Sequence, residues 1–244
     1  MHQALLHITN VSKTYPSGFN LRIDRLAIEE GERVGLVGNN GAGKTTMMLL
    51  TLGLLAKDAG QIRVNGFDVH GGIRWRRLTA SYLGESSLIT FLTPREYWAF
   101  VARAYELKPE ELEVRLEEFE DFIEVPSSKG GKLIRELSAG NRKKVGLLAA
   151  MLVRPRLLVL DEPFANLDPR SQNQLQGQLR RLNDEFGCTL FISSHDLPHV
   201  VEVGRRIVVV DRGRIVQDAP VCPGSLRDLR TLLTRSEPGA PALT

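Results

Sequence analysis

Cysteine is almost absent from this sequence: Cys188 and Cys222 are the only two among 244 residues, and they lie far apart. That count argues against a disulfide framework or a zinc site and fits a reducing compartment. No apolar run reaches the roughly eighteen residues that a membrane-spanning helix needs. The longest candidate, VGLLAAMLV, ends at Arg154. The N-terminus also lacks the charged start and apolar core of a signal peptide. We therefore expect that the chain does not cross a membrane by itself.

A strong excess of either charge is also missing. The chain carries 32 Lys and Arg against 29 Asp and Glu, a formal net charge of +3, and it has no dense basic tract or basic tail. We therefore expect no nucleic-acid partner. The hydrophobic fraction of 42% and the charged fraction of 25% are ordinary for a globular protein. The length suffices for one large domain or two small ones.

The order of the apolar segments predicts a parallel α/β core. Residues 2–35 alternate in short apolar runs typical of strands, and a helix is predicted from Thr45 to about Ala56. GQIRVNGFDV predicts a short hairpin. The unbroken aliphatic runs in RLLVLDEP and CTLFISSH are typical of buried parallel strands. RRIVVVDRGRIVQDA predicts two further strands around Arg212 and Gly213.

A helical insertion is predicted at about residues 87–152, between two parts of this core. LTPREYWAFVARAYEL and KPEELEVRLEEFEDFIEV both have helical character. In the second, one face carries the apolar residues Leu112, Leu116, Phe119 and Ile123. RELSAGNRKKVGLLAAML starts with a polar turn and continues as an apolar helix, so Ser138 is a candidate helix cap. The tail SEPGAPALT is predicted to be disordered.

The segment GNNGAGKTT, residues 38–46, matches the strand–GxxxxGK[ST]–helix pattern of a phosphate-binding loop. Its glycines let backbone N–H groups surround phosphate oxygens, and the helix that follows presents the positive end of its dipole to an anion. Lys44 can reach the terminal phosphates, and the Thr45 hydroxyl can ligate Mg²⁺. The alternative is an ordinary glycine turn. We interpret the loop as a nucleotide site.

A second acidic motif supports this interpretation. The predicted buried strand in LLVLDEP ends at Asp161 and Glu162. A carboxylate at this place can hold Mg²⁺, usually through water, and the next one can orient and deprotonate an attacking water. The alternative is a pair of idle, solvated carboxylates at a strand end.

With five further segments in place, the chain resembles the ATP-binding subunit of an ABC (ATP-binding cassette) transporter over about residues 5–220. Tyr15 in SKTYPSG matches the aromatic position that stacks on adenine, and GNNGAGKTT and LLVLDEP match the Walker A and Walker B motifs. YLGESS falls at the Q-loop, and LSAGN falls at the LSGGQ signature. ANLD, which ends at Asp168, matches the D-loop, and SSHD places His195 at the switch histidine.

The resemblance implies an α/β fold with four parts. These are a P-loop NTPase core with a parallel sheet, an antiparallel β subdomain and an inserted α-helical subdomain, followed by a tail. Residues 1–86 would hold the antiparallel β subdomain and the first part of the ATP-binding core. Residues 87–152 would form the helical subdomain with the signature, 153–225 the second part of the core, and 226–244 the C-terminal tail.

The resemblance also implies ATP and Mg²⁺ as cofactors and assigns roles to single residues. The catalytic residues would be Lys44, Glu162 as general base, and His195 as a contact to the γ-phosphate; the alternative for His195 is a satisfied core histidine. The metal ligands would be Thr45, Asp161 and Glu85. The nucleotide contacts would be Tyr15, Gly38, Asn39, Asn40, Gly41, Ala42, Gly43, Lys44, Thr45, Thr46, Ser138 and Gly140.

Head-to-tail pairing is the third implication, as a homodimer or a heterodimer. Ser138 and Gly140 would then face the ATP bound by the partner subunit, and Asp168 would organise the interface. The dimer would drive a separate multi-span membrane permease from the cytoplasmic face of the membrane. The stretch YLGE…LTPREYWAF looks like the exporter-type subunits that pair with six-span permeases. In SLITFLTPRE, Leu88 and Phe91 either contact such a permease or belong to the core.

Two other functions remain open from the sequence. One is a soluble ABC-type ATPase acting on nucleic acid or ribosomes, and the other is a nucleotide-binding regulator without turnover. Such soluble ATPases usually carry two cassettes or a long coiled-coil insertion, and neither is present here. An intact set of catalytic residues argues against the regulator.

The chain departs from the family pattern at two motifs. Glu85 stands at the Q-loop position where the family has Gln, and the signature carries Ala139 for Gly and Asn141 for Gln. Because Ser138 and Gly140 are kept, we predict a working but slower signature. The signature is followed by three basic residues, which form either a solvated helix face or a source of positive potential toward the phosphate: Arg142, Lys143 and Lys144.

Overall fold

The computed structural model describes residues 4–123 and 131–235, which form two β-sheets, seven α-helices and three short 3-10 helices. The antiparallel sheet has the order β2-β1-β4-β5 and contains β1 (Leu6–Thr14), β2 (Asn20–Ile28), β4 (Ala59–Val64) and β5 (Phe67–Asp68). The larger sheet has the order β10-β9-β3-β8-β7-β6. Its strands are β3 (Arg33–Val37), β6 (Thr79–Tyr82), β7 (Leu157–Leu160), β8 (Thr189–Ser194), β9 (Arg206–Asp211) and β10 (Arg214–Pro220).

The helices fall into three groups along the chain. The first is α1 (Lys44–Thr51), which follows β3. The second lies between β6 and β7 and comprises α2 (Pro94–Ala104), α3 (Pro109–Glu117) and α4 (Ala139–Leu152). The third comprises α5 (Pro169–Phe186), α6 (Leu197–Val203) and α7 (Ser225–Arg235). Among the described residues, no helix combines the length and the apolar character needed to cross a membrane.

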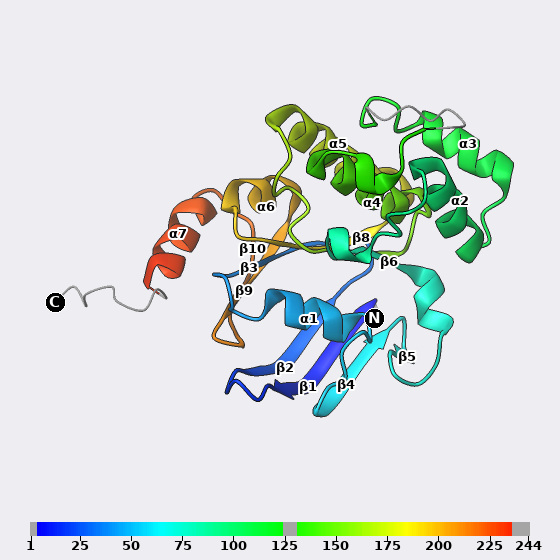
Figure 1. Ribbon diagram of the computed structural model, residues 1–244. Helices are drawn as coiled ribbons and strands as arrows, with labels where there is room; N and C mark the ends of the chain where they lie inside the picture. Colours follow the sequence, from blue (N-terminus) through cyan, green and yellow to red (C-terminus); the bar gives the residue numbers. More distant parts are fainter. Residues whose placement is uncertain (1–3, 124–130, 236–244) are drawn as a thin grey trace.

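The strands β3, β7 and β8 are buried along their whole length, and their side chains alternate between the two faces of the large sheet. Leu157 and Val159 of β7 pack into a core shared with α1 and the antiparallel sheet. Leu158 and Leu160 point the other way, into a core shared with α2 to α5. Figure 1 shows α1 between the antiparallel sheet and the large sheet, with α4 and α5 on the far side of the large sheet. The unbroken apolar runs of the sequence therefore reflect a strand covered from both sides.

Strand direction decides where the polar motifs meet. β3 is parallel to β8 and β9, and β7 is parallel to β6 and β8, whereas β10 runs antiparallel to β9. The carboxyl ends of the parallel strands therefore lie along one edge of the sheet, where ligands bind in open α/β sheets. The phosphate loop follows β3, Asp161 follows β7, His195 follows β8, and Glu85 follows β6 at this edge.

The structure confirms the predicted α/β class, with its parallel core, antiparallel sheet and inserted helices, and corrects some boundaries. Helix α1 ends at Thr51 rather than near Ala56, because Gly53 adopts a φ of 59° and turns the chain. Helix α3 ends at Glu117 because the next residues tighten into turns, with the Phe119 N–H donating to the Leu116 carbonyl. The predicted tail 226–244 begins as helix α7, and the stretch SEPGAPALT lies outside the described residues.

Candidate functional site

The phosphate loop connects the end of β3 with the start of α1. A Cβ atom on Gly38 would lie 2.3 Å from the Val210 carbonyl oxygen, so only glycine fits there. Gly41 and Gly43 have φ angles of 78° and 113°, a region that glycine enters without a steric penalty. Lys44 is buried, and its Nζ donates to the Gly38 carbonyl at 2.7 Å. The glycine pattern thus encodes a turn that folds the lysine back over the loop.

The turn between β9 and β10 holds this loop from outside. Gly213 donates its N–H to the Ala42 carbonyl at 2.9 Å, and its own carbonyl accepts the Arg22 N–H at 2.7 Å. Gly213 has a φ of 76°, and a Cβ atom on it would lie 2.1 Å from the Asn20 carbonyl oxygen. The loop is therefore positioned by a segment about 170 residues away in sequence, which was not expected from the sequence.

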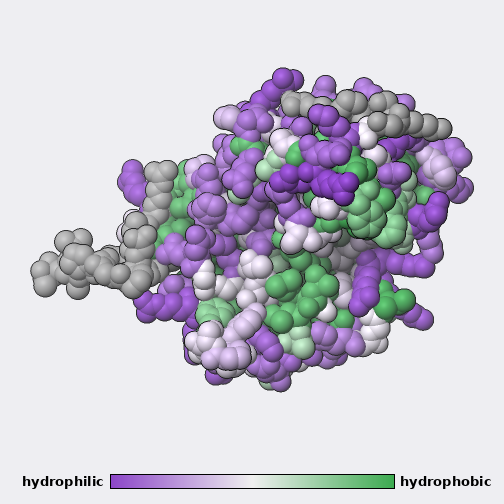
Figure 2. Space-filling view, in the orientation of Figure 1, coloured by the Kyte–Doolittle hydropathy of each residue, from purple (hydrophilic) through white to green (hydrophobic). Residues whose placement is uncertain are grey.

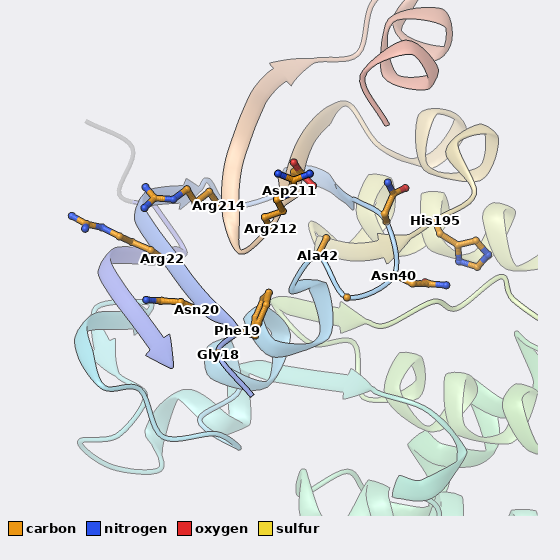
Figure 3. A pocket seen from close by; sticks show the side chains of 12 residues that line it. Gly18, Phe19, Asn20, Arg22, Asn40, Ala42, His195, Asp211, Arg212 and Arg214 are labelled. Carbon is orange, nitrogen blue, oxygen red and sulfur yellow. The ribbon is translucent and has the colours of Figure 1, made fainter. Parts of the chain in front are cut away.

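A pocket of about 1020 Å³ lies beside the loop. Figure 3 shows Asn40, Ala42 and His195 near one another, with Arg22 and Arg214 toward the other side. The arginines give this side of the loop positive potential, which favours an anionic ligand.

Asp161 is tied to the start of α1. The Thr45 hydroxyl donates to Asp161 Oδ2 at 2.7 Å, and the Ser193 hydroxyl donates to Asp161 Oδ1. Ser193 also accepts the Glu162 N–H at 2.9 Å, and it is fully buried. We did not predict a role for Ser193 from the sequence, although its place two residues before His195, at the end of a buried strand, was an available signal.

Glu162 lies between Lys44 and His195. Its Oε1 is 3.6 Å from Lys44 Nζ, and its Oε2 is 2.8 Å from His195 Nδ1 and accepts the His195 backbone N–H at 3.3 Å. The backbone of Glu162 has a φ of 47°, which is uncommon for a non-glycine residue and frequent at functional sites. The His195 side chain is 56% exposed, so the alternative of a core histidine is wrong.

The predicted adenine contact also lies beside the loop. The Tyr15 hydroxyl is 3.3 Å from Thr46 Oγ1, and its half-buried ring lies 6.0 Å from the ring of Phe19. The loop has a further contact with α7, because Asn39 Nδ2 donates to the Leu233 carbonyl at 3.2 Å. The described structure therefore places a C-terminal helix against the phosphate loop.

The signature segment stands apart from this group. Ser138 caps α4 and accepts the Asn141 N–H at 3.3 Å, so its local role as a helix cap is confirmed. Ser138 and Ala139 are exposed, and Gly140 faces the D-loop, where a Cβ atom would lie 3.7 Å from the Asn166 carbonyl oxygen. The contact described for the Ser138 side chain is within its own turn and does not reach Lys44 or Glu162.

The loop after β6 differs from expectation in its contacts. The Glu85 carboxylate accepts a hydrogen bond from Arg142 Nε at 2.6 Å rather than contacting Thr45 or Asp161, so its role as a metal ligand stays a prediction. Leu88 is only 8% exposed and belongs to the core, whereas Phe91 is 67% exposed. The two apolar residues therefore take different roles.

The three basic residues after the signature are not a solvated face. Lys143 and Lys144 are 7% and 3% exposed, and the Lys144 ammonium lies 5.7 Å from the centre of the Phe122 ring. Burial lowers the pKa of Lys143, although the nearby carboxylates of Glu162, Glu85 and Asp161 oppose this shift. The interpretation as a solvated helix face is wrong for both lysines.

Asp168 serves the D-loop as a helix cap. Its carboxylate accepts the Ser171 N–H at 3.0 Å and the Ser171 hydroxyl at 2.5 Å. The side-chain hydrogen bond from Ser171, with the backbone bond behind it, lowers the pKa of Asp168. The D-loop therefore leads directly into α5, and its predicted role at a subunit interface is not tested by these contacts.

The donors at this edge fit Mg²⁺. The Thr45 hydroxyl and the Asp161 carboxylate are adjacent oxygen donors, as Mg²⁺ prefers. Within residues 4–123 and 131–235, no group of three or more His, Cys, Asp or Glu side chains could hold a metal alone. This agrees with Mg²⁺, which usually takes one or two protein carboxylates together with phosphate and water.

A family model described as ABC transporter matches residues 21–165. The sulfate/thiosulfate import ATP-binding protein CysA of Gloeobacter violaceus is 35% identical over 210 residues, which is 86% of this chain and 61% of that protein. The spermidine/putrescine import ATP-binding protein PotA of Pseudomonas aeruginosa is 31% identical over 221 residues, 90% of this chain and 61% of that protein. The chain thus spans about three fifths of these relatives.

Solved structures give the same fold. A structure described as the ATP binding subunit of an ABC transporter superposes with a TM-score of 0.82 at 28% identity, covering 95% of both chains. A dimeric ATP-binding cassette in a post-hydrolysis state with ADP and Pi superposes with a TM-score of 0.78 at 23% identity, covering 89% of this chain and 99% of that chain. The two curated relatives are import proteins by name, so they give no support to the exporter-type resemblance.

Proposed function

The chain belongs to the ABC transporter family, and from that membership we propose that it is an ATP-hydrolysing subunit that powers a membrane transporter. Two ATP-binding subunits, alike or different, pair head to tail when ATP binds and separate after hydrolysis. A separate multi-span permease converts this motion into transport. The subunit is peripheral in this proposal and works at the cytoplasmic face of the membrane.

The position of the Glu162 carboxylate carries the proposal. Glu162 contacts Lys44 on one oxygen and His195 on the other, at the edge of the sheet where the phosphate loop begins. We assign Glu162 as the general base that takes the proton of the attacking water. His195 orients this carboxylate and reaches toward the γ-phosphate, and Lys44 offsets the phosphate charge. The buried location of Lys44 strengthens that attraction.

Thr45 and Asp161 would hold Mg²⁺. The ion, when bound, neutralises charge on the terminal phosphates. Ser193 supports this role because its hydroxyl donates to Asp161 and accepts the Glu162 backbone N–H. It thereby fixes the two acidic residues relative to each other. Glu85 was predicted as a third ligand, and its contact with Arg142 makes it the weakest member of that set.

The rest of the nucleotide site is divided between two chains. In one chain, the backbone of residues 38–46 surrounds the phosphates and Tyr15 stacks on adenine. In its partner, Ser138 and Gly140 approach the γ-phosphate from the N-terminus of α4. The exposure of Ser138 supports this division, because an exposed helix N-terminus of one chain can contact the ATP that another chain binds.

An apolar surface near α2 supports a permease contact. Figure 2 shows hydrophobic areas over α1 and α2 on one face of the molecule. Contiguous exposed apolar areas mark interaction sites. The exposed large apolar residues in the stretch of sequence from α1 to α2 are Leu54, Ile73, Phe91 and Phe100. We propose that the segment from Glu85 to Glu96 and these side chains form the permease contact. We propose no transported substrate, because the names of the two relatives give different ones.

We further propose that residues 87–152 move as a unit against the segments 1–86 and 153–225. The contacts of α2, α3 and α4 with one another support this grouping. Helix α4 also contacts β6, so in this proposal the unit moves while it is packed on the sheet.

Purified protein and a Glu162→Gln variant test this function. We expect Mg²⁺-dependent ATP hydrolysis by the wild type and a loss of about a hundredfold or more in the variant, because the amide cannot accept the proton of water. The variant should accumulate as an ATP-bound dimer, detected by light scattering after gel filtration. Glu110→Gln is a matched control because Glu110 is exposed on α3 and is not among the residues assigned to the site.

Three results would contradict the proposal. A wild-type protein without Mg²⁺-dependent hydrolysis, together with no trapped dimer, would favour a regulator without turnover. Stimulation of hydrolysis by RNA or ribosomes would favour the alternative ATPase. Purification from membranes without any integral membrane protein would contradict the permease partner.

A further inference from the structure

The signature helix α4 begins with an unusual concentration of positive charge. Its first turn has no acidic residue, and Arg142 and Lys143 stand at the fourth and fifth positions after the cap residue Ser138. Cations near a helix N-terminus are unfavourable because the helix dipole is positive there. A chain that keeps them needs compensating partners. Both residues have such partners, and the partners come from two other loops of the site.

Arg142 joins the loop after β6 to the turn before α4. Its Nε donates to Glu85 Oε2 at 2.6 Å, and its Nη1 donates to the Leu137 carbonyl at 2.7 Å. The Glu85 carboxylate thus offsets the cation, and it also places a negative charge near the helix start, where the dipole favours one. Both side chains of this pair are about one-third exposed or less, so water screens the pair only partly.

Lys143 joins α4 to the segment that carries Glu162. Its Nζ donates to the Glu162 carbonyl at 2.8 Å and to the Ala165 carbonyl at 2.5 Å. These carbonyls belong to a tight turn in which Glu162 has a left-handed backbone conformation. A buried ammonium that binds two carbonyls satisfies groups that would otherwise be costly to bury. Lys143 therefore supports the conformation of the turn that places Glu162.

We propose that Arg142 and Lys143 are positioning residues that fix the signature end of α4 against the Glu85 loop and the Glu162 turn. Glu85 in this role is the partner of Arg142 and not a metal ligand. This inference rests on the proposed function, because it concerns two halves of a site shared between chains. In a head-to-tail dimer, Glu162 serves one ATP and Ser138 serves the other. Lys143 then links the two sites through a single chain.

Steady-state hydrolysis by the purified full-length chain tests this role. Lys143→Met keeps a side chain of similar length without charge, and we expect kcat to fall by about tenfold to a hundredfold, since small misplacements cost that much. The KM for Mg-ATP should stay within about twofold, because the carbonyls that Lys143 contacts belong to the Glu162 turn and not to the phosphate loop. Lys57→Met is the matched control. A kcat of Lys143→Met within about twofold of wild type would overturn the role of Lys143.

A double-mutant cycle tests the pair. Glu85→Gln and Arg142→Gln should each lower kcat several-fold, and the double variant should be no worse than Arg142→Gln, because that change already removes the contact with Glu85. The exchanged pair Glu85→Arg with Arg142→Glu should recover part of the activity. Arg135→Gln, an exposed change in the preceding turn, is the control. A higher Mg²⁺ requirement in Glu85→Gln than in Arg142→Gln would make Glu85 a metal ligand and overturn this part of the proposal.

Amide hydrogen exchange gives a readout that does not depend on activity. Lys143→Met should speed exchange at Ala165 to Asp168, and Arg142→Gln should speed it at Ser138 to Asn141, with the thermal midpoint measured in parallel. Lys143→Gln replaces Lys143→Met if the latter does not fold. Unchanged exchange in both segments would contradict the positioning role. A wild type without hydrolysis would contradict the proposed function. The exchange data would still show whether Arg142 and Lys143 hold the two segments in place.

Discussion

The phosphate-loop side and the signature side of this chain differ in how far each completes its own contacts. On the phosphate-loop side, Lys44, Glu162 and His195 are joined directly, and the carboxylate of Glu162 lies between the other two. On the signature side, Ser138 is exposed, and the hydrogen bond described for its side chain lies within its own turn. In the proposed function, the first side is the half of the reaction centre that one chain assembles by itself. The second is presented outward, which suits a surface that another chain completes.

We expect the largest effect from two variants, one with a defect on the phosphate-loop side and one with a defect on the signature side. Lys44→Ala should remove most nucleotide binding, and Ser138→Arg should block approach to the partner's phosphate. Each variant alone should lose about a hundredfold or more of the ATPase activity, because charge stabilisation at the phosphates dominates catalysis. A one-to-one mixture should regain about a quarter of wild-type activity, since about half of randomly formed dimers contain one intact site of two.

Mixing is measured as ATP hydrolysis after the two purified variants are combined. Lys57→Ala in place of Lys44→Ala is the control for loss of a lysine. A mixture as inactive as its components would contradict the division of the site between two chains. A Ser138→Arg variant with wild-type ATPase activity would place the signature outside the site.

A smaller effect tests the support of the phosphate loop. Gly213→Ala places a Cβ atom against the Asn20 carbonyl and disturbs the turn that binds the Ala42 carbonyl. We expect a loss of about 1–3 kcal/mol in the free energy of unfolding, with weaker nucleotide affinity. Chemical denaturation and binding of a fluorescent ATP analogue measure the two quantities. Gly18→Ala is the control, since Gly18 also has a positive φ but open space around it. A change in nucleotide affinity no larger than that of the control would contradict the idea that the turn at Gly213 holds the phosphate loop.

The smallest effect compares two helical glycines. A Cβ atom on Gly146 of α4 would lie 2.4 Å from the Tyr82 ring, so Gly146→Ala should cost about 1–3 kcal/mol through overpacking. Gly177 of α5 has open space around it, so Gly177→Ala should stabilise the protein by about 0.5–1 kcal/mol. Thermal and urea unfolding of both variants measure the difference. Equal changes in stability would show that the signature helix is not held closely against β6.

The sequence predicted most of the phosphate-loop side. Gly38, Lys44 and Asp161 stand in short local patterns, because a nucleotide's phosphates need backbone N–H groups and a cation, and its Mg²⁺ needs a carboxylate, at the same edge of the sheet. The same reasoning failed for Ser193. A buried serine at a strand end has no local signature, and its contact with Asp161 depends on the pairing of β7 with β8.

The signature side was less predictable, as Glu85 and Lys143 illustrate. The family position of Glu85 suggested a metal ligand, and the charge of Lys143 suggested a solvated helix face. Which carboxylate meets which cation depends on how α4 lies against the loop after β6, and that is set by packing of the helix onto the sheet. Sequence periodicity gives the apolar face of a helix but not the partners of its charged residues.

What the sequence by itself determined is the chemistry of each motif and the α/β class, because both depend on residue types at short spacing. What only the tertiary structure decided is which charged groups are buried and paired. Lys143 is costly to bury unless carbonyls accept its hydrogen bonds, and the carbonyls of Glu162 and Ala165 come from the turn after β7, outside the helix that carries Lys143. The free energy of such a contact depends on the folded geometry, and no local pattern encodes it.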